Sequence, residues 1–307
     1  MTDHYQPRKN GYKKDSYERP TLSKEEYKIK KEQERNELFE MLDDVTEEVM
    51  NRPESFENYL STQARLDRYS ASNALLIYRQ MPSASRLKDF SGWGEDGVSI
   101  KKGEKHISIL EPSEYTRTNG TKGVFYNPKS VFDISQTTAA KRPTAPSLNT
   151  NPSEILIAML ETAPVQVENV DSFGFSDTVA EYNNETGVLS VRRNVNDGVK
   201  LFQSVAVELA FAELSVNSEV YDRREMTFDA VCVANMLCKR FGVPSERFTI
   251  KELPDSWKNK DEKEVRAELS SIRFAASNIN SRISNEIYRQ RQEQNQDRSY
   301  RSRDDAR

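Results

Sequence analysis

The sequence predicts an α+β protein built from two domains. Apolar residues recur at helical spacing at the start of the first half of the chain and at the end of the second half. Short strand patterns, separated by turn residues, lie between these two helical regions. Residues 138–152 are rich in Thr, Ala and Pro and lack apolar periodicity, so they are expected to be a linker. A chain of 307 residues is also long for one compact core.

The first domain, residues 22–137, is expected to begin with three helices. Ser23-Lys24-Glu25-Glu26 has the pattern of a capping box, and Pro53 ends the long helix that it starts. A second helix is predicted over about 54–65, and a third follows Ser70.

Strands are expected in the rest of this domain. Residues 98–100 and 106–110 are predicted to pair as an antiparallel hairpin around the Lys101–Glu104 turn. Asn119-Gly120 marks another turn, and residues 124–134 contain further strand material. The first domain is therefore predicted to be helical and then antiparallel β.

The second domain, residues 153–285, is predicted to be a β-hairpin with helices. Its expected elements are a short helix after Ser153, a hairpin formed by 178–183 and 188–193, and helices over about 197–215, 227–241 and 261–284. The flanking segments, residues 1–21 and 286–307, are polar and are expected to be a disordered arm and tail.

The composition excludes several classes of protein. Lys and Arg number 45 against 49 Asp and Glu, a net charge of −4, so any nucleic-acid surface must be a local patch. No apolar run is long enough to span a membrane, and the first residues lack the apolar region of a signal peptide, so a cytoplasmic location with no membrane partner is expected. Two cysteines, Cys232 and Cys238, cannot build a disulfide scaffold or a four-cysteine zinc module, and they are predicted to be buried thiols.

The sequence offers little for catalysis. It contains no Walker-type phosphate loop, no dinucleotide fingerprint and no nucleophile elbow, so no cofactor is expected. Its two histidines are His4, in the polar arm, and His106, in a predicted strand, and neither suits a Ser-His-Asp triad.

Residues 61–110 form a basic segment in which aromatic residues lie among the cations. The segment contains eight Lys and Arg but only five Asp and Glu. A mixture of cations and aromatic rings suits single-stranded nucleic acid, because the cations bind the phosphates while the rings stack on unpaired bases. Asn73 and Gln80 lie seven residues apart, on one face of the third helix, where their amides could contact bases or phosphates. The candidate contact residues are Arg65, Arg68, Tyr69, Asn73, Tyr78, Arg79, Gln80, Trp93, Lys101, Lys102 and Lys105.

This segment resembles the N-terminal domain of the ArdC-type antirestriction proteins, including the LtrC-like proteins of mobile elements. The run from Tyr69 to Pro82, YSASNALLIYRQMP, is similar to the family pattern Y-S-x-x-N-x-L-L-I-x-x-Q-x-P. It is followed by Trp93-Gly94-Glu95-Asp96-Gly97, by the KKGEK run 101–105 and a strand to Pro112, and by VFDISQ at 131–136. The resemblance covers residues 36–137 and implies a domain that binds single-stranded DNA during conjugation.

The second domain resembles the zincin-like metallopeptidase unit that usually accompanies this domain. The family places H-E-x-x-H on a helix after a β-hairpin, so that two imidazoles and a third acidic ligand hold a metal. The matching residues here are Val207, Glu208 and Phe211, and Glu225 or Asp229 stands near the position of the third ligand. Because Val and Phe cannot bind zinc, the resemblance implies a degenerate unit with no metal, no catalytic residue and a vestigial Glu208.

The sequence therefore favours a non-enzymatic single-stranded-DNA-binding protein of a bacterial mobile element, related to conjugation or antirestriction. Two alternatives stay open. One is a metallopeptidase with non-standard ligands. The other is an antirestriction protein that binds a restriction enzyme through the acidic face of residues 36–60, where eight Asp and Glu accompany one Arg. Besides single-stranded DNA, a restriction or conjugation protein is expected as a partner.

Overall fold

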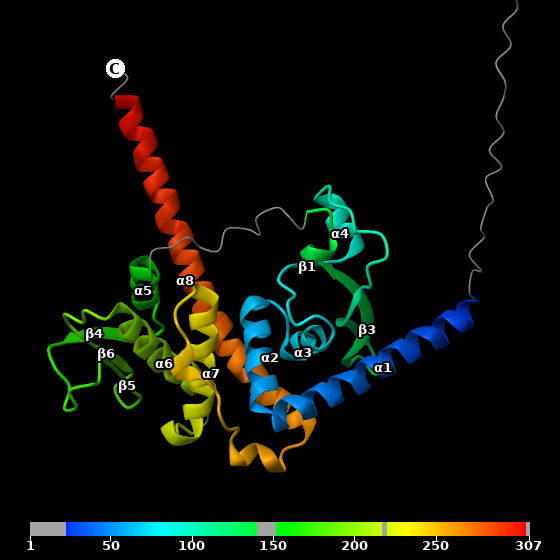
Figure 1. The fold of residues 1–307 in the computed structure, drawn as a ribbon, viewed down its shortest axis with the longest axis horizontal. Coiled ribbons are helices and arrows are strands. Elements are labelled where there is room, and N and C mark those ends of the chain that lie inside the picture. The colour runs from blue at the N-terminus through cyan, green and yellow to red at the C-terminus, as the bar shows by residue number, and fades with distance from the viewer. Residues whose placement is uncertain (1–22, 140–151, 217–219, 305–307) are drawn as a thin grey trace, which may run out of the picture.

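A computed structural model describes residues 23–139, 152–216 and 220–304 (Figure 1). The predicted α+β class is confirmed: helices predominate, and two small sheets of three strands each lie in different halves of the chain. Most of the predicted linker, and the arm before Ser23, lie outside the described residues. Within the part of the chain that is described, no helix has the length and apolar character needed to cross a membrane.

Three helices open the first unit, as predicted. They are α1 (Lys24–Asn51), α2 (Pro53–Arg65) and α3 (Ala71–Gln80). Ser23 forms the expected capping box with Glu26, and Ser70 caps α3 by accepting a hydrogen bond from the Asn73 N–H. The apolar stripes of these helices face one another and form the core of the unit.

The hairpin expected from 98–100 and 106–110 is wrong. Ile100 forms only an isolated bridge, to Thr137, whereas β2 (Ile107–Thr116) pairs antiparallel along its whole length with β3 (Lys122–Asp133). The Asn119-Gly120 turn joins these two long strands. Ten residue pairs form between β2 and β3, which stabilises this pairing more than the three residues 98–100 could. Asp89 caps a short helix, α4 (Phe90–Glu95), that the sequence patterns did not indicate.

The first sheet has the order β1-β3-β2, where β1 is Leu87–Lys88. All its pairs are antiparallel, and β2 lies at one edge. A 3-10 turn, η1 (Ile134–Gln136), follows β3. The hairpin tip lies along α1, and its base packs against α3 (Figure 1).

The second unit begins with α5 (Pro152–Glu161) and contains the predicted hairpin, β5 (Ala180–Asn183) and β6 (Val188–Arg192). A further strand, β4 (Gln166–Val170), runs parallel to β6 and gives the sheet order β4-β6-β5. Its sequence, QVENV, carries too few apolar residues to be recognised as a strand.

Three helices complete this unit: α6 (Gly198–Val216), α7 (Arg223–Phe241) and α8 (Glu262–Asp304). Short 3-10 turns, η2 (Glu246–Phe248) and η3 (Asp255–Asn259), lie between α7 and α8. Gly242 ends α7 in the left-handed conformation at φ 70°, which glycine adopts without steric cost. The two cysteines of α7 are buried thiols, also as predicted.

The last helix differs from the sequence prediction. Its backbone stays helical to Asp304, so the expected disordered tail from residue 286 is wrong over the described residues. Ile287 is buried, and Arg289 forms ion pairs with Glu286 and Glu293 at helical spacings. Arg, Gln and Glu are also strong helix formers, and such pairs reinforce them.

The two units share one apolar core. The largest cluster of buried apolar side chains contains residues from α1, α2 and α3 together with residues from α5 to α8. Phe56 of α2 has its ring centroid 5.5 Å from that of Phe228 in α7 and 5.6 Å from that of Trp257. Because this packing joins the halves of the chain, the full chain is the appropriate material for experiments.

Candidate functional site

Asn73 and Gln80 hold the edge strand β2. They lie on one face of α3, as predicted, and each amide makes two reciprocal hydrogen bonds with one backbone residue. Asn73 Nδ2 donates to Leu110 O at 2.9 Å and its Oδ1 accepts from Leu110 N at 2.9 Å. Gln80 does the same with Ser108, at 2.8 Å for both bonds. We call this pair of contacts the amide clamp.

The amide clamp replaces a missing strand neighbour. β2 lies at the edge of its sheet, so the outward N–H and C=O groups of Ser108 and Leu110 would otherwise lack protein partners. The amides of Asn73 and Gln80 therefore have a scaffold role, whereas the contacts with bases or phosphates that the sequence indicated stay a prediction.

The predicted stacking residues divide into buried and accessible ones. Trp93 is only 1% exposed, and its Nε1 donates to Phe132 O at 2.9 Å. Tyr78 is also buried. Both rings pack in the core and present little surface to a base, so they can at most support a site, whereas Tyr69 is half-buried beside a pocket.

Several predicted cations are used within the protein. The Arg65 guanidinium donates to the carbonyl oxygens of Ser61, Pro82 and Ala84, and so ties the end of α2 to the loop after α3. Arg79 pairs with Glu48 of α1 at 3.0 Å between Nη1 and Oε2.

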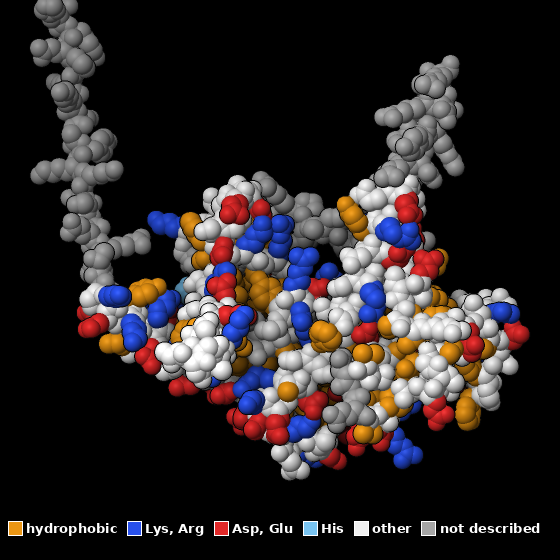
Figure 2. Space-filling view, turned by 180° about the vertical axis from the view of Figure 1, so that it is seen from behind, with side chains coloured by type: hydrophobic (Ala, Val, Ile, Leu, Met, Phe, Trp, Pro, Cys, Tyr) orange, Lys and Arg blue, Asp and Glu red, His pale blue; other side chains and the backbone are white. Residues whose placement is uncertain are grey.

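The remaining cations lie on loops. Lys101 Nζ donates to Ser135 O at 2.7 Å, and it forms no ion pair with an acid in the described part of the chain. Arg68, Lys102 and Lys105 are exposed, and their side chains make no hydrogen bond or ion pair with the described residues. On the face that Figure 2 shows, Lys and Arg side chains lie among Asp and Glu side chains.

The VFDISQ run is a second scaffold element. Asp133 accepts hydrogen bonds from the backbone N–H groups of Ser85, Arg86 and Ser135 at 2.7 to 2.9 Å. Burial opposes ionisation of Asp133, but these donors outweigh it and hold the pKa of its carboxyl below the usual value. Like the amide clamp, this motif fixes the sheet and the loops around it.

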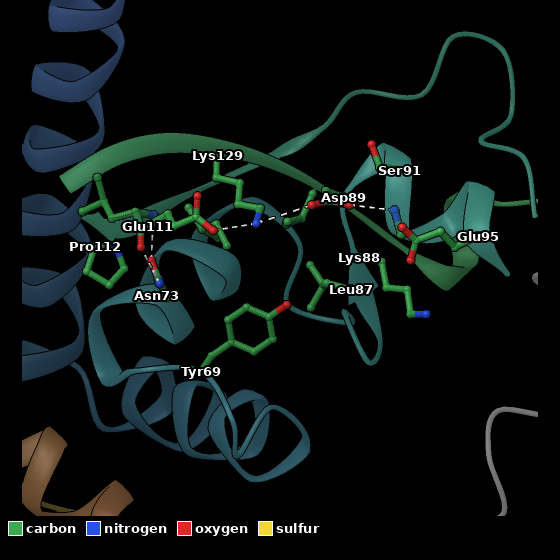
Figure 3. A pocket seen from close by; sticks show the side chains of 14 residues that line it. Tyr69, Asn73, Leu87, Lys88, Asp89, Ser91, Glu95, Glu111, Pro112 and Lys129 are labelled. Carbon is green, nitrogen blue, oxygen red and sulfur yellow. Dashed lines mark hydrogen bonds and ion pairs between the residues drawn. The ribbon is translucent and has the colours of Figure 1, made fainter. Parts of the chain in front are cut away.

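A pocket of about 660 Å³ opens beside the amide clamp (Figure 3). Tyr69, β1 and α4 form one part of its wall, and β2 and β3 form the other. Leu87, Ile109 and Val131 contribute apolar surface, while Asn73 lies at its edge. Its volume lies in the range of small-molecule sites in proteins.

Charged groups surround this pocket in compensating pairs. Lys129 Nζ lies 2.6 Å from a carboxylate oxygen of Glu111 and 3.4 Å from one of Asp89. The hydrogen bond from Lys129 to Glu111 raises the pKa of Lys129, and a hydrogen bond from the Gly92 N–H lowers the pKa of Asp89. Lys88 pairs with Asp96 at 2.8 Å. Glu95 also lines the pocket, and its carboxylate has no hydrogen bond or ion pair with the described residues.

The hairpin tip carries aromatic residues that the sequence analysis missed. Tyr115, Phe125 and Tyr126 are each more than 40% exposed. The Arg35 guanidinium of α1 lies 4.5 Å from the centroid of the Phe125 ring, and Arg117 lies 5.9 Å from that of Tyr115. These three aromatic residues lie within 111–127, outside the basic segment, and their presence among polar residues was the signal that could have indicated this surface.

Three of the eight acids in the face predicted from 36–60 form ion pairs within the protein. Glu48, Glu57 and Asp43 form ion pairs with Arg79, Lys239 and Arg266. The other five acids make no ion pair with the described residues; they are Glu37, Glu40, Asp44, Glu47 and Glu54.

Glu208 of the second unit is buried and has both carboxylate oxygens occupied. Its Oε1 accepts from Arg223 Nη2 at 2.6 Å, and its Oε2 accepts from the Tyr182 N–H of β5 at 2.8 Å. The Arg223 guanidinium also lies 4.0 Å from the centroid of the Phe211 ring. Burial disfavours the charge of Arg223, but Glu208 more than compensates and raises the pKa of Arg223.

These residues do not fit a metal ion. The carboxylate of Glu208 is already neutralised by a guanidinium, and the side chains of Val207 and Phe211 offer no ligand atoms. Asp229, one of the two residues near the expected third ligand, lines a separate pocket with Trp257 and Lys260, where burial raises its pKa to about 7.

Comparison with solved structures confirms the predicted ArdC-like fold. A metal-free crystal structure of the antirestriction protein ArdC from plasmid R388 aligns over 80% of this chain and 98% of its own, with a TM-score of 0.53 and 14% identity. A Mn(II)-bound structure of the same protein aligns over 71% of this chain and 86% of its own, with a TM-score of 0.48 and 16% identity.

Sequence comparison gives a shorter match. An uncharacterised Bacillus anthracis protein is 32% identical over 108 residues, which are 33% of this chain and 18% of that protein. This chain therefore spans less than a fifth of the relative's length. No family model matches the sequence.

The amide clamp makes a testable prediction about the edge strand. In Asn73→Ala and Gln80→Ala, two partly buried backbone groups lose their partners, so urea titration should show a loss of about 1–3 kcal/mol in the unfolding free energy of each variant. The backbone amide of Leu110 or Ser108 should also exchange its hydrogen faster. Asn36→Ala, at an exposed position of α1, is the matched control. Equal stability of all three variants and the parent would contradict the scaffold role.

Proposed function

We propose that this chain is an antirestriction protein of the ArdC type, encoded by a bacterial mobile element, that binds single-stranded DNA and has no peptidase activity. The observation that carries the proposal is the fold shared with ArdC, since it extends through both units of the chain. The matching motifs of the first unit support it, because they form the amide clamp and the Asp133 cluster that maintain this fold.

The surface of the first unit supports DNA binding. Arg68, Lys102 and Lys105 are exposed cations that can pair with phosphates. Tyr115 and Phe125 present partly exposed rings beside Arg117 and Arg35. Single strands are bound by this combination of cations and rings without sequence readout.

The second unit supports the absence of peptidase activity. A zincin-type peptidase needs two histidines that hold the metal and a general base that is not already paired with a cation. Both oxygens of Glu208 are occupied, by Arg223 and by Tyr182, and the apolar residues Val207 and Phe211 occupy the histidine positions of the family motif. We infer that this unit serves for packing or for contact with a partner protein.

The DNA-binding proposal predicts a salt-dependent affinity carried by three residues. In fluorescence anisotropy with a labelled oligonucleotide, the variant R68A/K102A/K105A should bind more weakly than the parent. The plot of log Kobs against log salt concentration should become shallower by about 2, because three phosphate contacts are lost.

A matched variant tests whether position matters in this experiment. R224A/K251A/K263A removes one Arg and two Lys from exposed positions of the second unit, so the net charge changes equally. It should bind like the parent. Binding that is independent of salt, or equal losses in both triple variants, would overturn the proposal.

The proposal that the second unit lacks peptidase activity predicts which substitutions would let it bind zinc. The parent should contain no stoichiometric zinc by elemental analysis. The variant V207H/F211H restores the two histidines but keeps Arg223, whose cation lies against Glu208 and repels a metal ion. The variant V207H/F211H/R223A, which lacks this cation, should therefore bind zinc roughly tenfold more tightly. Stoichiometric zinc in the parent, or peptide cleavage that a chelator abolishes, would contradict this account.

A further inference from the structure

The pocket beside the amide clamp has the chemistry of a base-binding site. It combines a partly accessible ring, Tyr69, with apolar surface from Leu87, Ile109 and Val131. Figure 3 shows Tyr69 and Glu95 approaching it from different elements, the loop before α3 and the helix α4. A flat heterocycle needs a face on which to lie and polar groups that meet its edge, and both are present here.

The charges of the pocket select which part of a nucleotide can enter. Lys88 and Lys129 are paired with Asp96, Asp89 and Glu111, and Glu95 adds a negative charge that forms no ion pair with the described residues. A phosphate would meet carboxylates there and be repelled, whereas a neutral base would not. The exposed cations on the loops outside the pocket are the groups suited to the phosphates.

Glu95 also distinguishes among bases. A carboxylate only accepts hydrogen bonds, so it favours a base that presents an amino donor. Cytosine carries an amino group at the position where thymine carries a carbonyl oxygen. The Glu95 carboxylate makes no hydrogen bond or ion pair with the described residues and can therefore accept this bond.

We propose that this pocket receives one unpaired base of a bound single strand, stacked against Tyr69, with an amino group donating to Glu95. The proposal rests on the proposed DNA-binding function and adds a preference for bases that carry an amino group, cytosine over thymine.

The test compares the full-length protein with oligo-dC and oligo-dT of equal length, by anisotropy at pH 8. The parent should bind oligo-dC roughly fivefold or more tightly than oligo-dT, as expected for one carboxylate contact to a cytosine amino group. Glu95→Gln should reduce this ratio towards one, because an amide can donate to the thymine carbonyl. Tyr69→Leu should weaken binding of both oligomers roughly fivefold or more, through loss of a stacked base.

Two control variants accompany these. Glu252→Gln and Tyr288→Leu make the same chemical changes at exposed positions far along the sequence in the second unit, and they should bind like the parent. Because Glu95 is exposed, Glu95→Gln is not expected to disturb folding. This variant therefore tests the proposal even if Tyr69→Leu impairs folding.

The outcomes separate the two proposals. Salt-dependent binding with equal affinity for both oligomers, unchanged by Glu95→Gln, would overturn the base pocket and leave the DNA-binding function standing. A lack of binding to either oligomer in dilute buffer would overturn the DNA-binding function and the pocket with it.

Discussion

The amide clamp is the interaction on which the first unit depends. Through Asn73 and Gln80, α3 acts as the neighbour that the edge strand β2 lacks. This fixes β2, and with it β3, against the helices, and the pocket forms where Tyr69, β1 and α4 face the held strands. An amide is suited to this task because it donates and accepts at once, as a backbone peptide group does.

Compensation of charge limits what the basic segment can do. Residues 61–110 look cationic when their side chains are counted, yet Arg79, Arg86 and Lys88 are paired with acids and Arg65 binds carbonyl groups. Arg68, Lys102 and Lys105, whose side chains have no hydrogen bond or ion pair with the described residues, lie on loops. The second unit follows the same principle, since the buried charge of Glu208 is balanced by Arg223 and by a backbone N–H.

The sequence predicted the helices well because their caps and apolar stripes are local signals, as at Ser23, Ser70 and Gly242. Strand pairing depends on distant residues, so the partner of β2 was assigned wrongly and the polar strand β4 was missed. Prediction of the candidate site was limited for the same reason, because its residues also depend on distant parts of the chain. The spacing of Asn73 and Gln80 correctly placed them on one face, but nothing local shows that a strand lies opposite, nor that Trp93 is buried or that Glu95 lines a pocket.

The central claim is that a single strand of DNA binds the first unit, at the surface beside the amide clamp. Hydrogen exchange of the full chain with and without an oligo-dC ligand tests this most directly, because it locates binding without altering any residue. We predict slower exchange over residues 87–95 and 107–112, with little change in α6 and α7. Protection confined to the second unit, or no protection at a saturating DNA concentration, would contradict the account.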